Sequence, residues 1–378
     1  MNSALGLSLA ILFILGVPIA VSIGLASVIG IEASGRLPLL LIAQRMFTGI
    51  DSFPLMAIPL FILAGNLMEV GGLSRRLVKH NYPKPLAASI QASSAELGVL
   101  IPPSIPLILY GVSTDTSVGK LFIAGLGPGL VVAGSLMALV LVICRMRGIG
   151  KDDGLDRASP GAALWSALPA LLVPVVILGG IYSGIFTPTE ASAAAVAAAL
   201  IVGMGLYGEL KFRDLPEILT KTIIATSAIM IIISAAALFS FLITRSGLPN
   251  EIAAWFKEIF ESRIAFLLAV NILLLIVGMF IETSAAILVL APILTPIAIS
   301  YGVDPVHFGL IIVVNLALGM ITPPLGVNLF AACTVANLRV EKIIPQLIWF
   351  VLTVFAALMV ITYVPAITLW PVEWVFGE

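Results

Sequence analysis

The sequence predicts an all-α polytopic membrane protein made of two inverted repeats, with broken helices and re-entrant hairpins. Hydrophobic residues make up 60% of its 378 residues and charged residues only 10%, whereas an average soluble domain is about 25% charged. Several apolar runs approach the roughly 20 residues that a helix needs to cross a bilayer. Other apolar runs are interrupted by proline or glycine, and three sequence anchors recur in the two halves of the chain.

Eight of the apolar runs are expected to be membrane spans. They cover residues 5–29, 53–68, 121–144, 162–181, 191–207, 223–242, 264–280 and 343–369. Five further runs are shorter or are broken by glycine, proline or a charge, so we expect half-helices and parts of re-entrant hairpins there. These are residues 37–43, 97–110, 285–300, 308–320 and 326–335.

The charge and cysteine content exclude several other classes of protein. The net charge is −1, and there is no basic tract of the kind that binds nucleic acid. Both cysteines lie in apolar runs, so no disulfide framework is expected, and two histidines are too few for a histidine metal cluster. The sequence has no Walker A loop, HExxH or GxSxG motif. We therefore expect neither a cofactor nor an enzymatic activity.

Basic residues gather in two clusters, which predicts the orientation of the chain. Cytoplasmic loops of membrane proteins carry an excess of Lys and Arg, so both clusters are expected on the cytoplasmic side. The first 35 residues and residues 343–378 contain no Lys or Arg, which places both termini outside. The clusters consist of Arg75, Arg76, Lys79 and Lys84, and of Arg145, Arg147, Lys151 and Arg157.

Three pairs of anchors indicate an internal repeat. Pro18 and Pro188 lie 170 residues apart, Gly72 and Gly247 lie 175 apart, and two Pro-Pro pairs lie 221 apart. The offset between the halves therefore jumps by 46 residues after the second anchor. Many membrane transporters consist of two inverted halves, although Gly-Leu and Pro also recur by chance in membrane sequences.

The jump predicts that the first repeat, residues 1–150, is shorter than the second repeat, residues 151–378. The additional part of the second repeat is roughly residues 264–301, and the missing part of the first would fall between Val78 and Tyr82. One explanation is omission of residues that the molecule contains, which would separate neighbouring Cα atoms by far more than 3.8 Å. The other is a truly shorter protein, which we favour.

Residues 322–328, Thr-Pro-Pro-Leu-Gly-Val-Asn, break an apolar run. Proline interrupts a helix and frees backbone carbonyls, and such carbonyls are tolerated at membrane depth only where they are buried or line a cavity. Carbonyl, hydroxyl and amide oxygens suit a hard cation. Thr322, Pro323, Gly326 and Asn328 are therefore candidates for a sodium or substrate site. The alternative is a proline kink whose carbonyls are satisfied by neighbouring helices.

Glu282, Thr283 and Ser284 lie between two apolar runs. An ionisable residue inside a membrane is costly and usually functional. The second run contains Pro292 and Pro296, which favours a re-entrant hairpin with this tripeptide at its tip. Thr283 and Ser284 are the better candidate ligands, with Glu282 nearby. The alternative is a loop between two full spans, with Glu282 in the headgroups or in water.

The first half has counterparts of both motifs. Residues 93–96 are Ser-Ser-Ala-Glu, and Pro102, Pro103 and Ser104 match the second Pro-Pro break. Ser94, Pro102, Pro103 and Ser104 are therefore candidate site residues of the first half. Small residues also let helices approach closely, so packing alone would explain the serines.

These motifs resemble those of the large membrane subunit of the TRAP (tripartite ATP-independent periplasmic) transporters. The resemblance rests on residues 100–112, which contain Ile-Pro-Pro-Ser-Ile-Pro and Tyr-Gly-Val, on 184–191, Gly-Ile-Phe-Thr-Pro-Thr-Glu-Ala, and on 321–328. It covers nearly the whole chain. It implies two inverted repeats, each with a re-entrant hairpin and a broken helix, and an elevator motion of a transport domain against a scaffold.

The resemblance also implies a function and partners. The chain would be the permease of a sodium-coupled importer of organic acids, such as C4-dicarboxylates or sialic acid, in the bacterial inner membrane. Its partners would be a small four-helix membrane subunit, a periplasmic substrate-binding protein and the lipid bilayer, with no nucleic acid. One sodium site would lie between residues 282–284 and 322–328, whereas the first-half site would lack its hairpin tip. The alternative is a shortened, non-transporting paralogue or remnant of the same family.

Overall fold

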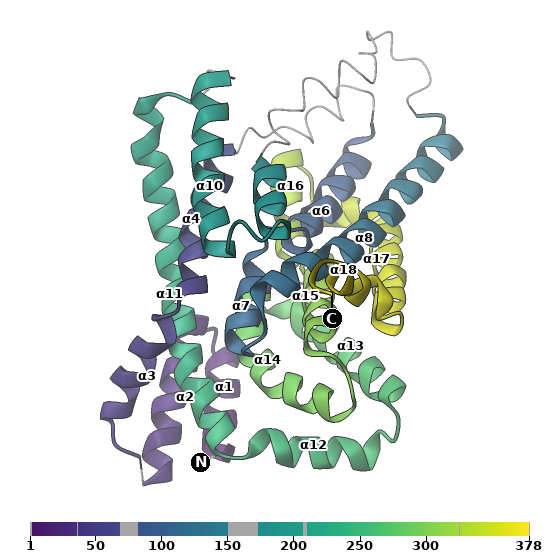
Figure 1. Cartoon of the computed structure of the whole chain (residues 1–378). Helices are drawn as coiled ribbons and strands as arrows, with labels where there is room; N and C mark the ends of the chain where they lie inside the picture. The colour runs from purple at the N-terminus through teal and green to yellow at the C-terminus, as the bar shows by residue number, and fades with distance from the viewer. Residues whose placement is uncertain are drawn as a thin grey trace.

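The computed structural model describes residues 2–35, 37–68, 82–149, 173–206, 210–324 and 326–377, and these form helices and connecting segments without a strand. Within these residues six helices are long and apolar enough to cross a membrane, and there are up to eight spans if each of two bent helix pairs counts as one. The predicted all-α polytopic membrane protein is therefore confirmed. In Figure 1 the longer helices run between the upper and lower ends of the molecule, and α12 lies across the lower end.

The first-half helices are α1 (Asn2–Ile14), α2 (Ile19–Ser34), α3 (Leu40–Ile50), η1 (Phe53–Met56), α4 (Ala57–Met68), α6 (Lys84–Leu100), α7 (Ile105–Ser113) and α8 (Val118–Arg147). An apolar helix, Val173–Tyr182, follows. The later helices are α10 (Pro188–Leu200), η2 (Ile201–Leu206), η3 (Phe212–Asp214), α11 (Leu215–Arg245), α12 (Leu248–Ile259), α13 (Arg263–Phe280), α14 (Thr283–Ser300), α15 (Pro305–Ile321), α16 (Val327–Ala336), α17 (Val340–Tyr363) and α18 (Ala366–Phe376).

The prediction of one span over residues 5–29 is wrong, because this run folds into the hairpin α1–α2. The chain reverses at Gly16, which has a φ of +71°, and at Pro18, which has no N–H to continue a helix. The helices pack closely, since a Cβ placed on Gly30 would lie 3.0 Å from Cδ1 of Leu5. A glycine and a proline in a long apolar run therefore divide it into two helices.

Other predicted spans are also divided. Residues 343–369 form α17 and then α18, with a break at Val364 and Pro365. The predicted span 53–68 is instead one arm of a bent pair, in which Leu40–Ile50 and Phe53–Leu67 meet at 63°, and the predicted short run 37–43 falls in the other arm. Only the end of the predicted span 162–181 lies within the described residues.

The five runs predicted to be short or broken have mixed outcomes. Residues 97–110 contain the break between α6 and α7, which bend by 42°, and residues 326–335 form the 10-residue half-helix α16. Residues 285–300 belong to α14, which has 18 residues and continues through Pro292 and Pro296. Each of α13 and α14 is long enough to cross a membrane. The expectation that the prolines would shorten the second of these helices is therefore wrong.

The two broken helices run antiparallel to each other. The chain passes from α6 through residues 101–104 into α7, and from α15 through residues 322–326 into α16. The end of α7 meets the start of α15, since the Tyr110 hydroxyl donates to the carbonyl of Pro305 at 2.7 Å, while α16 packs against α6. Inverted repeats place their broken helices in this way. The boundary between residues 150 and 151 lies outside the described residues and stays a prediction.

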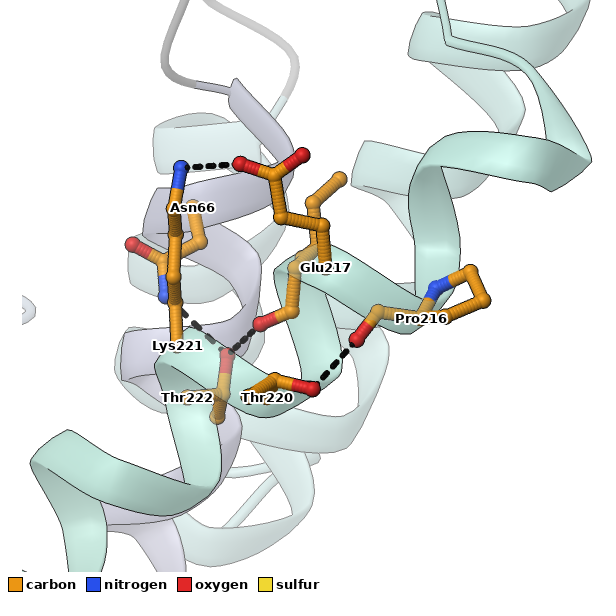
Figure 2. Close-up of polar contacts among 7 residues, drawn as sticks. Asn66, Pro216, Glu217, Thr220, Lys221 and Thr222 are labelled. Carbon is orange, nitrogen blue, oxygen red and sulfur yellow. Dashed lines mark hydrogen bonds and ion pairs between the residues drawn. The ribbon is translucent and has the colours of Figure 1, made fainter.

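Two hydrophobic cores hold the fold together. The larger core runs from α4 through α18, and the smaller joins α1 and α2 to the second half of α11. Figure 2 shows where α4 meets α11: the Asn66 amide donates to the Thr222 hydroxyl at 3.0 Å, next to an ion pair between Lys221 and Glu217 at 2.9 Å. This contact ties the first half of the chain to the second.

The predicted gap falls partly outside the described residues. Residues 78–81 are not among them, so the continuity of the backbone between Val78 and Tyr82 stays a prediction. From residue 82 to residue 102 the structure has a single helix, α6. The described part of this stretch therefore contains no hairpin.

Several residues of the basic clusters, namely Arg75, Arg76, Lys79, Lys151 and Arg157, also lie outside the described residues. Lys84 begins α6, and Arg145 and Arg147 lie in the last turn of α8. The start of α6 and the end of α8 both lie toward the upper end of Figure 1, so these basic residues share one end of the molecule. Cytoplasmic placement of that end stays an expectation.

Candidate functional site

The second-half site begins at the turn between α13 and α14. Glu282 caps α14, since its Oε2 accepts from the backbone N–H of Ala285 at 3.2 Å. Its other oxygen, Oε1, accepts from the Ser284 hydroxyl at 2.8 Å. A carboxylate at a helix N-terminus is stabilised by the helix dipole. Glu282 therefore stabilises the turn, and the Ser284 hydroxyl uses its hydrogen in the bond to Glu282.

Thr283 points from this turn toward the second broken helix. Its side chain is 1% exposed, and its hydroxyl donates to Sδ of Met320 at 2.9 Å. Met320 lies in the last turn of α15, two residues before Thr322. The structure therefore brings the predicted hairpin tip and the predicted helix break together.

At the break between α15 and α16, side-chain and backbone groups lie close to carbonyl oxygens of the same segment. The Thr322 hydroxyl donates to the carbonyl of Leu318 at 2.8 Å. Gly326 precedes α16 with a φ of +27°, and a Cβ there would lie 3.2 Å from the carbonyl oxygen of Thr322 and 3.3 Å from that of Met320. The sequence requires glycine at this point because both the positive φ and the close carbonyls disfavour a side chain.

The remaining candidates of the second half lie around this break. Pro323 is half-buried, and it ends α15 as expected of a residue without an N–H donor. Asn328 is in the first turn of α16 and is half-buried. Within the described part of the chain, no hydrogen bond joins its amide to another residue. Leu325 lies outside the described residues.

The first-half candidates are less closely connected. Ser104 caps α7: its Oγ accepts from the backbone N–H of Leu107 at 3.3 Å and donates to the carbonyl of Val99 in a short contact. Pro102 is buried and Pro103 half-buried at the break between α6 and α7. Ser94 lies on α6 and bonds only within its own helix, to the carbonyl of Gln91 at 3.2 Å. Ser94 therefore makes no hydrogen bond to the break within the described residues.

A buried polar network beside the second-half site was missed by the sequence reasoning. Asn315 on α15 donates to Oδ1 of Asn271 on α13 at 2.7 Å, and Asn271 donates to the hydroxyl of Thr362 on α17 at 3.2 Å. His307 contacts the carbonyl of Thr362 at 3.2 Å and the hydroxyl of Thr368 on α18 at 2.8 Å. These amides and the histidine lie within apolar runs, and that isolation was the available signal.

The oxygen atoms of this arrangement are of the kind that ligates a hard cation. Both threonine hydroxyls use their hydrogen, Thr283 toward sulfur and Thr322 toward a carbonyl, so their lone pairs remain available. The carbonyls of Met320 and Thr322 face the same space near Gly326. The described residues contain no cluster of three His, Cys, Asp or Glu that would hold a transition metal.

Comparison with known proteins shows the family. The family model described as "Tripartite ATP-independent periplasmic transporter, DctM component" matches residues 7–80 and 76–367. The chain belongs to this family. The predicted resemblance to the TRAP large membrane subunit is therefore confirmed.

Curated relatives of this DctM chain align over most of its length. The isethionate TRAP transporter permease protein DctMQ of Oleidesulfovibrio alaskensis is 40% identical over 95% of this chain, which spans 64% of that relative. The C4-dicarboxylate large permease DctM of Rhodobacter capsulatus is 34% identical over 95% of this chain and 96% of its own. The sialic acid large permease SiaM of Vibrio cholerae is 33% identical over 86% of this chain and 88% of SiaM.

The solved structure of the YdaH transporter of Alcanivorax borkumensis is similar in fold. It superimposes with a TM-score of 0.54 at 13% identity, covering 89% of this chain and 88% of YdaH. At this identity the similarity concerns the fold alone. It agrees with a polytopic helical fold.

The alignments also bear on the predicted gap. The match to the isethionate permease runs over 408 positions but takes in 95% of this 378-residue chain, about 359 residues, so about 49 positions lack a residue of this chain. The family match divides into two parts, which meet at residues 76–80. In this alignment the number of positions without a residue of this chain is close to the 46 residues that the repeat offsets predict.

Proposed function

We propose that this DctM chain is the permease subunit of a sodium-coupled importer of organic acids of the C4-dicarboxylate or sialic-acid class, in the bacterial inner membrane. It is a transport protein rather than an enzyme, and Na⁺ is its coupling ion. A periplasmic binding protein delivers the substrate, a small four-helix membrane subunit completes the complex, and transport proceeds by an elevator motion. Membership of the DctM family and relatives named for such acids support this function.

The contact between Thr283 and Met320 carries the sodium part of the proposal. The Thr283 hydroxyl lies 2.9 Å from Sδ of Met320, and the carbonyl oxygens of Met320 and Thr322 lie 3.3 and 3.2 Å from the place that a Cβ on Gly326 would take. A Na⁺ ion between them would take hydroxyl oxygens from Thr283 and Thr322 and carbonyl oxygens from the break. Asn328 and Pro323 border the same segment, and Ser284 and Glu282 fix the turn. Site residues of the first half would be Ser94, Pro102, Pro103 and Ser104.

Sodium binding is tested without a substrate by thermal unfolding of the purified chain in NaCl and in KCl at equal ionic strength. A ligand at about 100 times its Kd stabilises a protein by about 2.7 kcal/mol, so NaCl is expected to raise the unfolding temperature. Thr283→Val and Thr322→Val are expected to abolish the difference between the two salts. Thr353→Val is the matched control, because Thr353 makes the same bond to the carbonyl four residues earlier, at 2.8 Å. Equal loss in all three variants, or in none, contradicts the site.

Transport is tested in proteoliposomes that contain the chain and the small subunit. Labelled succinate or sialic acid is added with its binding protein, and uptake is expected only with an inward sodium gradient.

A second candidate function is that of a shortened, non-transporting member of the family. It is favoured by the roughly 49 positions of the alignment to the isethionate permease that have no residue of this chain. Sodium stabilisation without uptake would support that second function.

A further inference from the structure

Helices α6 and α15 occupy equivalent places in the two halves, and both have 17 residues. The offset of 221 residues that pairs the two Pro-Pro breaks also pairs Gly98 with Gly319 and Ser94 with Asn315. The two helices can therefore be compared position by position.

On α15 both of these positions are covered by α13. A Cβ placed on Gly319 would lie 2.3 Å from the carbonyl carbon of Gly278, so the two backbones are in direct contact. One helical turn earlier, the Asn315 amide donates to both the carbonyl and Oδ1 of Asn271, at 2.9 and 2.7 Å. A close glycine pair and an interhelical amide bond are the usual means of holding helices together in a membrane.

On α6 the same positions are open. Gly98 is exposed, and among the described residues no atom lies within 4 Å of the place that a Cβ would take. Ala95, on the same face, is also exposed. Within the described part of the chain Ser94 bonds only within α6, and the Oε1 of Gln91 is buried without a hydrogen-bond partner. We call Ser94, Ala95 and Gly98 the open face of α6, which Gln91 borders one turn earlier.

The open face lies at membrane depth. Gly98 is 14 residues beyond Lys84, the first residue of α6, which corresponds to about 21 Å along the helix axis at 1.5 Å per residue. Lipid chains offer no partner for a polar group, and an unpaired amide in hydrocarbon is costly. A helix with a small residue and a hydrogen-bonding side chain would cover this face better than lipid does.

The relatives show what such a cover would be. The alignment to the isethionate permease has about 49 positions without a residue of this chain, and the family match divides at residues 76–80, just before α6. The equivalent stretch of the second half, before α15, is the helix pair α13–α14.

We propose that the open face of α6 is a docking surface for a separate membrane polypeptide that forms a helical hairpin like α13–α14. Its first helix would place a small residue against Gly98 and an amide or hydroxyl against Ser94 and Gln91. The hairpin would complete the first half in trans. This proposal does not depend on sodium coupling or on transport.

The test uses the full chain with Cys144→Ser and Cys333→Ala, so that a single introduced thiol can be followed. The probe is the additional segment of the Oleidesulfovibrio alaskensis permease that falls at the junction, co-expressed as a separate peptide. Maleimide labelling of Gly98→Cys is measured with and without the peptide. Ala95→Cys is a second probe of the same face, in case the first variant fails to fold. Gly134→Cys on α8 is the control, since Gly134 is equally exposed with open space around it.

We expect fast labelling of Gly98→Cys and Gly134→Cys in the chain alone. With the peptide, labelling at Gly98→Cys should slow at least tenfold, with no change at Gly134→Cys. Gly98→Leu should abolish co-purification of the peptide without changing the unfolding temperature of the chain alone. Equal labelling with and without the peptide overturns the proposal, as does a Gly98→Cys thiol that is already protected in the chain alone.

Discussion

Gly278 on α13 and Gly319 on α15 are in backbone contact, because a Cβ on Gly319 would lie 2.3 Å from the carbonyl carbon of Gly278. Gly278 is four residues before Glu282, and Gly319 is three residues before Thr322. This contact therefore sets the position of the α13–α14 turn relative to the broken helix. The candidate sodium site depends on two residues that contribute no ligand to it.

Replacing Gly319 with alanine is expected to destabilise the chain by about 1–3 kcal/mol, the usual range for an overpacked interior. Thermal unfolding in detergent measures the change. Gly98→Ala is the matched control at the equivalent position of α6, where the space is open. That control should leave stability unchanged or raise it slightly, because alanine favours a helix over glycine. Similar effects of both substitutions would contradict the difference between the two helices.

Asn328→Leu is expected to weaken the dependence on sodium more than it weakens membrane insertion. A half-buried amide at the start of α16 is costly in a membrane unless an ion or a free backbone group is its partner. The difference between the unfolding temperatures in NaCl and in KCl measures the dependence on sodium. The amount of folded protein in the membrane measures insertion. A folded variant with unchanged sodium dependence would show that Asn328 has only a structural role.

Asn315→Leu should destabilise the contact between α13 and α15. It removes two hydrogen bonds to Asn271, and interhelical hydrogen bonds in membranes are worth about 0.6–2 kcal/mol. The double variant Asn271→Leu with Asn315→Leu should cost less than the sum of the single variants, because each single variant leaves a buried amide partner unpaired. Additive costs in a double-mutant cycle measured by thermal unfolding would argue against the bond.

Tyr110→Phe is expected to weaken the junction between the two halves by about 0.5–1.5 kcal/mol per hydrogen bond lost. The Tyr110 hydroxyl donates to the Pro305 carbonyl and accepts from the Thr295 hydroxyl at 3.2 Å. Phenylalanine preserves the packing of the ring against Gly309. The matched control is Tyr301→Phe, which removes one bond, to the carbonyl of Phe260. A smaller loss for Tyr110→Phe than for the control would contradict this role.

Much of the candidate site could be predicted from local sequence. Pro-Pro at 102–103 and 323–324 interrupts apolar runs. Proline has no backbone N–H to donate to the carbonyl four residues earlier, so it disfavours continuation of a helix. Residues 282–284 separate two apolar runs, which predicts a turn there, and in the structure α13 ends at Phe280 and α14 begins at Thr283. These features depend on a few neighbouring residues, so the sequence suffices to locate them.

Other local expectations were wrong because neighbouring residues alone did not decide them. Pro18 lies in the turn after α1 and precedes the first residue of α2, whereas Pro292 and Pro296 lie inside α14, which remains a continuous helix of 18 residues. A proline inside a transmembrane helix is tolerated when neighbouring helices satisfy the freed backbone groups. Whether such neighbours exist is a property of the packed structure.

By itself, the sequence determined that this chain is an all-α membrane protein and that its helices break at the two Pro-Pro pairs, because composition and proline act along the chain. The repeat spacing also predicts a first half shorter by about 46 residues. Only the tertiary structure decided that Thr283 meets Met320, that Asn271 bonds Asn315, and that Gly98 is open where Gly319 is covered. Those relationships join residues that are tens of residues apart. Which of them form depends on how closely particular backbones can approach, and local sequence does not encode that.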